Sequence, residues 1–79
     1  MEKRELLSRV QDIFRDVFGI ENLEIAETTN ASDIEDWDSL MHISILAAVQ
    51  DEFGVVFNMD EITNMKNVGD IITAIGEKM

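Results

Sequence analysis

The chain has 79 residues, no cysteine and one histidine, and its 17 acidic against 6 basic side chains give it a net charge of −11. These counts exclude disulfides, thiolate metal centres and multi-histidine metal sites, and nucleic-acid phosphates and anionic lipids would repel such a chain. No apolar run approaches the ~18 residues of a membrane span, and the first residues lack the apolar core of a signal peptide. We therefore expect one domain over residues 1–79, a cytoplasmic monomer that binds no metal, membrane or nucleic acid.

Apolar residues in the first part of the chain recur every three or four positions: Leu6, Leu7, Val10, Ile13, Phe14, Val17 and Phe18. This spacing predicts a helix from about residue 3 to residue 18 with one apolar face. Gly19 follows at the position where a left-handed residue commonly ends a helix.

A second apolar series predicts a helix over residues 39–53. Its apolar positions are Leu40, Ile43, Leu46, Ala47, Val49 and Phe53. Asp36, Asp38 and Ser39 are favourable residues near a helix start, and Gly54 is suited to the helix end.

The last part of the chain predicts a short helix and a longer one. One or two turns over residues 60–65 would face inward through Met59, Ile62 and Met65. The segment 55–57 also fits a short β-strand, which is the competing interpretation. A final helix would bury Val68, Ile71, Ile72, Ile75 and Met79, with Asn67 as its cap and Asp70 as a capping-box partner.

The connection between the first two predicted helices, about twenty residues from Gly19 to Asp38, is long for a compact domain. We expect it to be ordered and draped across the helices, anchored by Ile20, Leu23, Ile25, Ile34 and Trp37. The predicted fold is therefore all-α: a small antiparallel four-helix bundle of three main helices and one short helix, with a long loop between the first two helices.

Charge is unevenly distributed along this chain. Between Asp16 and Met65 there are twelve acids and no lysine or arginine. Such a stretch is typical either of a solvated acidic surface or of a docking face for basic partner proteins. Composition alone leaves both interpretations open.

The segment Asp38-Ser39-Leu40 places a serine hydroxyl at the start of the second helix, where backbone N–H groups and the helix dipole favour an anion. Taken alone, these residues also fit an ordinary helix start. The longer series Glu35-Asp36-Trp37-Asp38-Ser39-Leu40, followed by a helix through Asp51-Glu52-Phe53-Gly54, resembles the attachment region of acyl and peptidyl carrier proteins. The resemblance covers nearly the whole chain, because the other helices and the Thr28–Ser32 loop fall in the family's order.

This resemblance implies that Ser39 receives a 4′-phosphopantetheine arm from coenzyme A, through a separate Mg²⁺-dependent phosphopantetheinyl transferase. The arm's thiol would carry acyl or related intermediates as thioesters to partner enzymes of lipid, polyketide or related biosynthesis. The chain would then be a non-catalytic tether, and its benefit would be effective concentration at each partner. The resemblance also implies that Asp38 helps to position the arm and the transferase, and that Leu40 anchors the helix start. An unmodified acidic module that binds a basic partner directly is the alternative function.

Two features depart from the family's common pattern. Asp36 stands where many members have glycine, at a turn before the serine. The exposed positions expected on the second helix hold Met41, Ser44 and Gln50, where carriers of fatty-acid synthesis show acids. These differences favour a stand-alone carrier dedicated to a particular set of enzymes, with weaker charge steering and stronger apolar contact.

We expect the partner-docking surface to include Trp37, Met41, His42, Ser44, Asp51 and Glu52. Trp37 fits a buried loop anchor better than a partly exposed partner contact, because large aromatic side chains bury well. His42 lies one helical turn after Ser39, but no nucleophile-elbow glycines flank the serine. We therefore expect an exposed histidine rather than a catalytic pair.

By analogy with the family, a cargo chain would lie near Leu46, Phe53, Met59 and Ile62. Met41, Met59 and Met65 fit a flexible pocket of this kind. For Met59 and Met65, ordinary filling of the core is an equally good interpretation.

Overall fold

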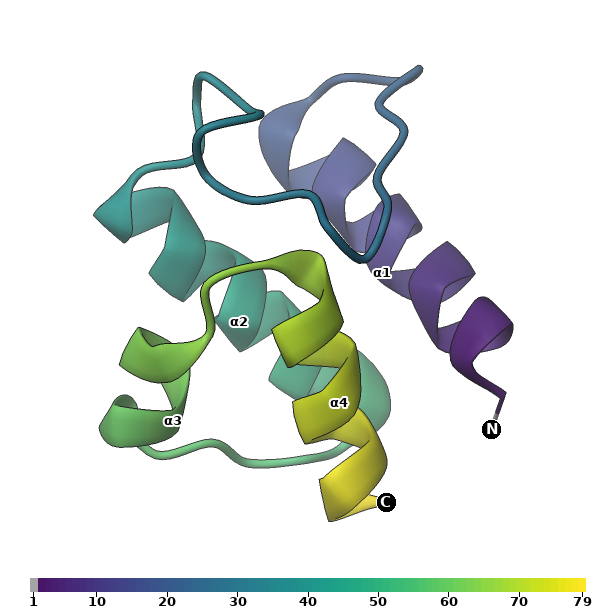
Figure 1. Ribbon diagram of the computed structural model, residues 1–79, viewed down its shortest axis with the longest axis vertical. Coiled ribbons are helices and arrows are strands. Elements are labelled where there is room, and N and C mark those ends of the chain that lie inside the picture. Colours follow the sequence, from purple (N-terminus) through teal and green to yellow (C-terminus); the bar gives the residue numbers. More distant parts are fainter. Residues whose placement is uncertain (1) are drawn as a thin grey trace.

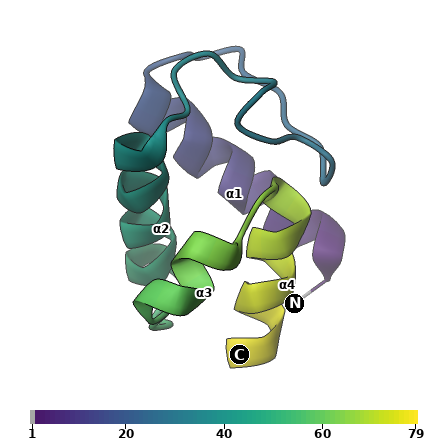
Figure 2. The same cartoon turned by 60° about the vertical axis from the view of Figure 1, so that its left-hand side comes forward.

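The computed structural model describes residues 2–79, which contain four helices: α1 (Lys3–Phe18), α2 (Ser39–Phe53), α3 (Met59–Asn64) and α4 (Val68–Lys78). α1 packs against α2 and α4, both of which run in the opposite direction to it (Figures 1 and 2). The long loop crosses the end of the bundle at which α2 and α4 begin. The predicted all-α bundle of three main helices and one short helix is confirmed. None of the four helices has the length and apolar character needed to cross a membrane.

The ends of α1 and α2 follow the predicted glycine signals. Gly19 and Gly54 have φ angles of 69° and 66°, in the left-handed region that glycine adopts without steric cost. Their N–H groups donate to the carbonyl oxygens of Arg15 and Gln50 and so satisfy two of the acceptors left free at the helix ends. Both predicted helix boundaries are therefore confirmed.

The starts of α3 and α4 depend on asparagine caps. The Asn58 side chain accepts from the Glu61 N–H while the Glu61 carboxylate accepts from the Asn58 N–H, which is a complete capping box. Asn67 accepts from the Asp70 N–H as predicted. The reciprocal bond expected for Asp70 is wrong, because its carboxylate accepts from the Lys66 N–H instead.

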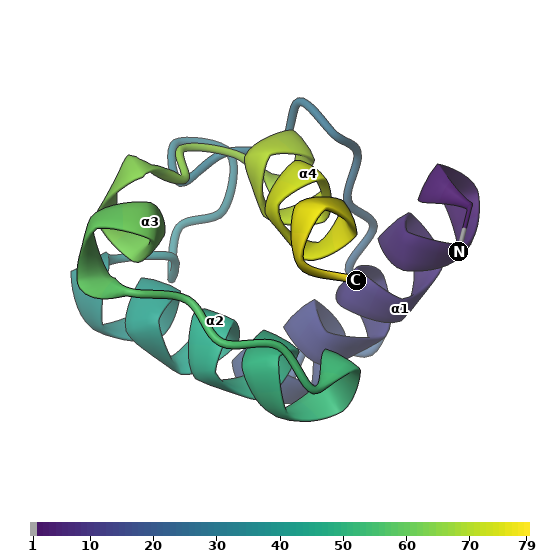
Figure 3. The same cartoon turned by 90° about the horizontal axis from the view of Figure 1, so that it is seen from below.

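The segment between α2 and α3 runs back along α2, and so brings α3 beside the start of that helix (Figure 3). Gln50 holds this returning segment against α2, because its Oε1 accepts a hydrogen bond from the Phe57 N–H at 2.8 Å. Val55 and Phe57 point into the core from this extended segment, whereas Val56 is exposed. No strand occurs in residues 2–79, so the competing β-strand interpretation is wrong.

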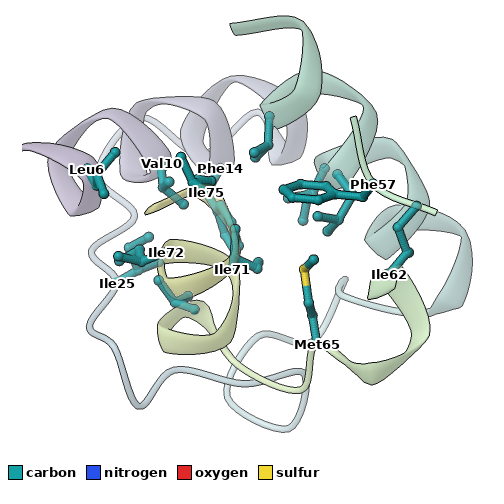
Figure 4. Packing of buried hydrophobic residues seen from close by; sticks show 14 of the residues in the cluster. Leu6, Val10, Phe14, Ile25, Phe57, Ile62, Met65, Ile71, Ile72 and Ile75 are labelled. Carbon is teal, nitrogen blue, oxygen red and sulfur yellow. The ribbon is translucent and has the colours of Figure 1, made fainter. Parts of the chain in front are cut away.

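The core forms where α1, α4 and the loop meet α2 and α3. Figure 4 shows Val10 and Phe14 of α1 close to Ile75 of α4, with Phe57, Ile62 and Met65 on the side of α3. The predicted face of α1 and the inward positions of Ile62 and Met65 are confirmed. The inward positions expected for Met59 and Met79 are wrong, since these side chains are 61% and 60% exposed.

The predicted buried face of α2 is wrong at its beginning. Leu40 is 72% exposed and Ile43 is 48% exposed, whereas Ile45, Leu46 and Val49 are completely buried. Apolar residues occur on nearly every side of the first three turns of this helix, so their spacing does not select one face. The exposed apolar side chains are left facing solvent near Ser39.

The long loop is ordered, as expected, and its main anchors are Ile25, Ile34 and Trp37, all buried. Leu23 packs against the core from a partly buried position. Ile20 is 39% exposed and lies outside the core cluster, so it is not an anchor. An isolated β-bridge between Asn30 and Asn67 joins the loop to the start of α4.

Candidate functional site

The start of α2 presents an accessible hydroxyl. Asp38 is the N-cap, and its Oδ1 accepts from the Met41 N–H at 2.9 Å. Ser39 is the first helical residue, and its side chain is exposed. Unpaired N–H groups and the positive end of the helix dipole gather at this position. A phosphodiester on the Ser39 oxygen would therefore be stabilised electrostatically and would remain reachable by another protein.

A cleft of about 440 Å³ adjoins this serine, and we call it the Ser39 cleft. One wall is the start of α2, the other is α3, and the segment after α3 completes it. Its lining includes Ser39, His42, Ile43, Met59, Ile62 and Lys66. This volume is typical of small-molecule sites, and the mainly apolar walls with a few polar groups suit a flexible chain tethered at Ser39.

Trp37 and His42 occupy the inner part of the Ser39 cleft. The Trp37 side chain is 5% exposed and meets the Phe14 ring edge-on, with centroids 5.1 Å apart. Its indole N–H donates to His42 Nδ1, and His42 Nε2 lies 2.8 Å from the Ile62 carbonyl oxygen. The loop-anchor interpretation of Trp37 is thus correct, and the expected partner contact is wrong. The expectation of an exposed His42 is also wrong, because this residue is half-buried and both of its ring nitrogens are engaged within the chain.

The other predicted docking residues differ in their accessibility. Ser44 and Asp51 are exposed, as expected, and Met41 is half-buried. Glu52 is exposed but forms an ion pair with Arg9 at 2.9 Å. Gln50 is not a free surface residue, because it bonds to the Leu46 carbonyl and the Phe57 N–H.

Leu40 does not anchor the helix start, in contrast to the implied role. Its side chain extends into solvent directly after the serine, and Asp38 provides the helix start through its cap. Asp36, which replaces the family's glycine, needs no left-handed conformation, because only glycines have positive φ in residues 2–79. The departure at Asp36 therefore causes no backbone strain at the site.

Two of the four residues expected to accommodate a cargo chain, Met59 and Ile62, line the Ser39 cleft. Leu46 is completely buried in the core. The Arg9 Cζ atom lies over the Phe53 ring, 5.2 Å from the ring centroid. Neither of these residues lines the cleft. Their expected role in accommodating a cargo chain therefore stays a prediction.

Lys66 and Thr63 line the Ser39 cleft but were not predicted from the sequence. Lys66 provides a positive charge near a site otherwise rich in carboxylates. This charge would attract a phosphodiester attached to Ser39. No local motif marks these two residues, because the return of the chain along α2 brings them to Ser39. In residues 2–79 no group of three or more histidine, aspartate or glutamate side chains is arranged to hold a metal ion.

Comparison with known proteins agrees with this geometry. The family described as PP-binding, phosphopantetheine attachment site, matches residues 8–75. The chain is 32% identical over 75 residues to an acyl carrier protein of Acidothermus cellulolyticus, with 95% of this chain and 89% of that protein covered. It is 30% identical over 73 residues to a meromycolate extension acyl carrier protein of Mycobacterium leprae, with 92% of this chain and 64% of that protein covered.

Solved structures share the fold. The solution structure of the holo acyl carrier protein from Geobacter metallireducens has a TM-score of 0.85 and 32% sequence identity to this chain, with 92% of this chain and 84% of that one covered. The match covers most of both chains. The chain therefore belongs to the acyl carrier protein family, whose members carry acyl groups on a 4′-phosphopantetheine prosthetic group.

Proposed function

We propose that Ser39 is the attachment residue and that the chain is a non-catalytic carrier of acyl groups, held as thioesters on the arm. The observation that supports this most strongly is the exposed hydroxyl of Ser39 as the first residue of α2, beside a cleft. A buried serine would have been inaccessible to any transferase. The arm would supply the thiol for the thioester, and this chain would supply the anchor and the surrounding surface.

Attachment would occur through attack of the Ser39 oxygen on the pyrophosphate of coenzyme A. The phosphopantetheine would be transferred to the serine, the nucleotide portion would leave, and the serine proton would pass to a base of the transferase. Asp38 would keep the serine at the helix start by capping α2. The N–H groups of the first turn would stabilise the new phosphodiester.

We further propose that the partners are a phosphopantetheinyl transferase and acyl-loading and acyl-processing enzymes with basic or apolar docking patches. The net charge of −11 would attract basic surfaces, and the exposed Leu40 and Ile43 would provide apolar contact next to the arm. The small number of acids exposed on α2 favours enzymes of a dedicated pathway. The hypothesis of a dedicated carrier fails if general fatty-acid synthase enzymes elongate the holo-protein as efficiently as their own carrier.

We also propose that residues 1–79 form one carrier domain that acts as a monomer in the cytoplasm, where coenzyme A is available for the modification. Analytical ultracentrifugation and fractionation of the native cell test the last two points. A stable dimer or a membrane-bound pool would contradict them.

The attachment residue is tested by incubating the protein with coenzyme A, Mg²⁺ and a broad-specificity phosphopantetheinyl transferase. Intact-mass measurement should show the addition of one arm to the wild type and to Ser44→Ala, and none to Ser39→Ala. Ser44 is the matched control because it is an exposed serine on the same helix. If several transferases leave the wild type unmodified, the unmodified interaction module becomes the better interpretation.

A further inference from the structure

The imidazole of His42 connects two groups of opposite hydrogen-bonding character. The Trp37 Nε1–H lies 3.1 Å from His42 Nδ1, and the Ile62 carbonyl oxygen lies 2.8 Å from His42 Nε2. An indole N–H can only donate, and a carbonyl oxygen can only accept. Nδ1 must therefore be the unprotonated nitrogen, and Nε2 must carry the hydrogen. We call this directional series the Trp37–His42–Ile62 relay.

One end of the relay is fixed in the core. Trp37 packs edge-on against Phe14, a completely buried residue of α1, and its ring stacks with the His42 ring at a centroid distance of 5.9 Å. Neither aromatic ring can move without disturbing the packing between the long loop and α1. The Trp37 indole therefore holds His42 in one orientation.

The other end of the relay is a hydrogen bond to the backbone of α3. Ile62 lies in the last turn of this six-residue helix, where carbonyl oxygens lack partners within the helix. Its oxygen also accepts from the Met65 N–H at 3.3 Å, so His42 provides the second and shorter bond. A helix this short depends on tertiary contacts for its stability.

The bond from His42 to Ile62 is the only hydrogen bond between α2 and α3 in residues 2–79. On its far side α3 is held to α4 by the exposed ion pair between Glu61 and Lys78. Ile62 and His42 both line the Ser39 cleft, on opposite walls. The relay is therefore a direct link between the two walls of the cleft.

We propose that His42 is a positioning residue for the Ser39 cleft: the relay holds α3 against α2 at the separation that lets the cleft shelter a thioester carried from Ser39. The inference rests on the carrier function proposed above, because only a tethered cargo needs a cleft of fixed width beside that serine. Without the relay, α3 would move away from α2 and the attached thioester would become more accessible to solvent.

Three substitutions separate the two bonds of the relay. His42→Gln places an amide N–H near the position of Nε2, so the bond to Ile62 is retained. His42→Asn places its amide near Nδ1, within reach of Trp37 but not of Ile62. His42→Phe retains a ring of similar size for the stack and removes both bonds. A purely space-filling role predicts that the phenylalanine variant behaves as the wild type.

The first measurements use the protein without its arm, so that they are independent of the carrier function. Nitrogen-15 NMR of the wild type should show a neutral imidazole with hydrogen on Nε2 and a bare Nδ1. Hydrogen exchange at the end of α3 should be about fivefold faster in His42→Asn and His42→Phe, the expected effect of one lost hydrogen bond, and unchanged in His42→Gln. The amides of α1 report global unfolding and serve as the internal reference.

The final measurement uses the holo-protein loaded with a medium-length acyl thioester. Hydroxylamine should release the acyl group about fivefold faster from His42→Asn and His42→Phe than from the wild type, with rescue in His42→Gln. The proposal is overturned if hydrogen is found on Nδ1, if exchange in α3 changes only in parallel with α1, or if release rates are equal in all four proteins. Failure to add the arm would instead overturn the proposed function and would leave the first measurements intact.

Discussion

The N–H of Gly69 donates to the carbonyl oxygen of Glu27 at 2.8 Å, and a Cβ at position 69 would lie 3.0 Å from that same oxygen. The adjacent N–H of Val68 donates to the Thr29 carbonyl at 2.9 Å. The long loop thus satisfies two N–H groups at the start of α4 that have no partner within the helix. This close approach of two backbones holds the loop on the bundle and leaves little room for a Cβ at position 69.

Gly69→Ala should therefore destabilise the protein. The new methyl group pushes the loop away from α4, which costs more than the gain in helix propensity, with a net loss of about 1 kcal/mol. Gly76→Ala is the matched control, because a Cβ there meets nothing within 4 Å in the same helix. It should be more stable than the wild type by about 0.5–1 kcal/mol. Urea unfolding measures both changes, and equal effects at the two glycines would contradict the close contact.

Two leucines on α2 test which face of this helix is buried. Leu46→Ala removes a completely buried side chain and should cost about 2–5 kcal/mol in the free energy of unfolding. Leu40→Ala changes a side chain that is 72% exposed and should alter stability by less than about 0.5 kcal/mol. Thermal and urea unfolding give both values. A large loss at Leu40 would restore its role as an anchor of the helix start.

Removal of the cap at the start of α2 should weaken the helix that carries Ser39. Asp38→Ala leaves the Met41 N–H without its acceptor and should cost about 1 kcal/mol, whereas Asp38→Asn retains a capping oxygen and most of the stability. Asp36→Ala is the control, because that side chain does not cap the helix. Comparable stability of Asp38→Ala and the wild type in urea would show that the cap contributes little.

Glu61 should make stability depend on acidic pH. The hydrogen bond from the Asn58 N–H, followed by that from Lys78, lowers the pKa of the Glu61 carboxyl below its ordinary value of 4.5. Ionised Glu61 therefore stabilises the folded state above pH 4.5, and this contribution is lost as the pH falls through the lower folded-state pKa.

Glu61→Gln tests this dependence. The difference in unfolding free energy between the wild type and Glu61→Gln should be largest at neutral pH and should shrink on acidification below 4.5. Glu35→Gln, at an exposed loop position, is the reference substitution. A difference between wild type and Glu61→Gln that does not change with pH would contradict the assigned cause of the shift.

Helix boundaries could be predicted from the sequence because their signals are local. Gly19, Gly54 and Asn67 each act within a few residues of the helix end that they define. The position of Ser39 at the start of α2 follows from the same local signals. Its exposure does not follow from the cap alone, because Val68 is the first residue of the equally capped α4 and is completely buried.

The rest of the site depends on contacts between distant segments. The bond from His42 to Ile62 joins residues twenty positions apart, and it exists because Gln50 holds the returning segment against α2. The face of α2 could not be predicted, because apolar residues surround its first turns and the choice between Leu40 and Ile45 is made by the packing of α1. Local patterns therefore predicted the anchor but not the cleft beside it.

Localisation of the arm within the protein tests the central claim most directly. The holo-protein is digested, and fragmentation mass spectrometry identifies the serine that carries the phosphopantetheine. We predict that the arm is found on Ser39 and on none of the other serines, Ser8, Ser32 and Ser44. An arm on one of those three residues, or a native protein that never carries an arm, would contradict the account.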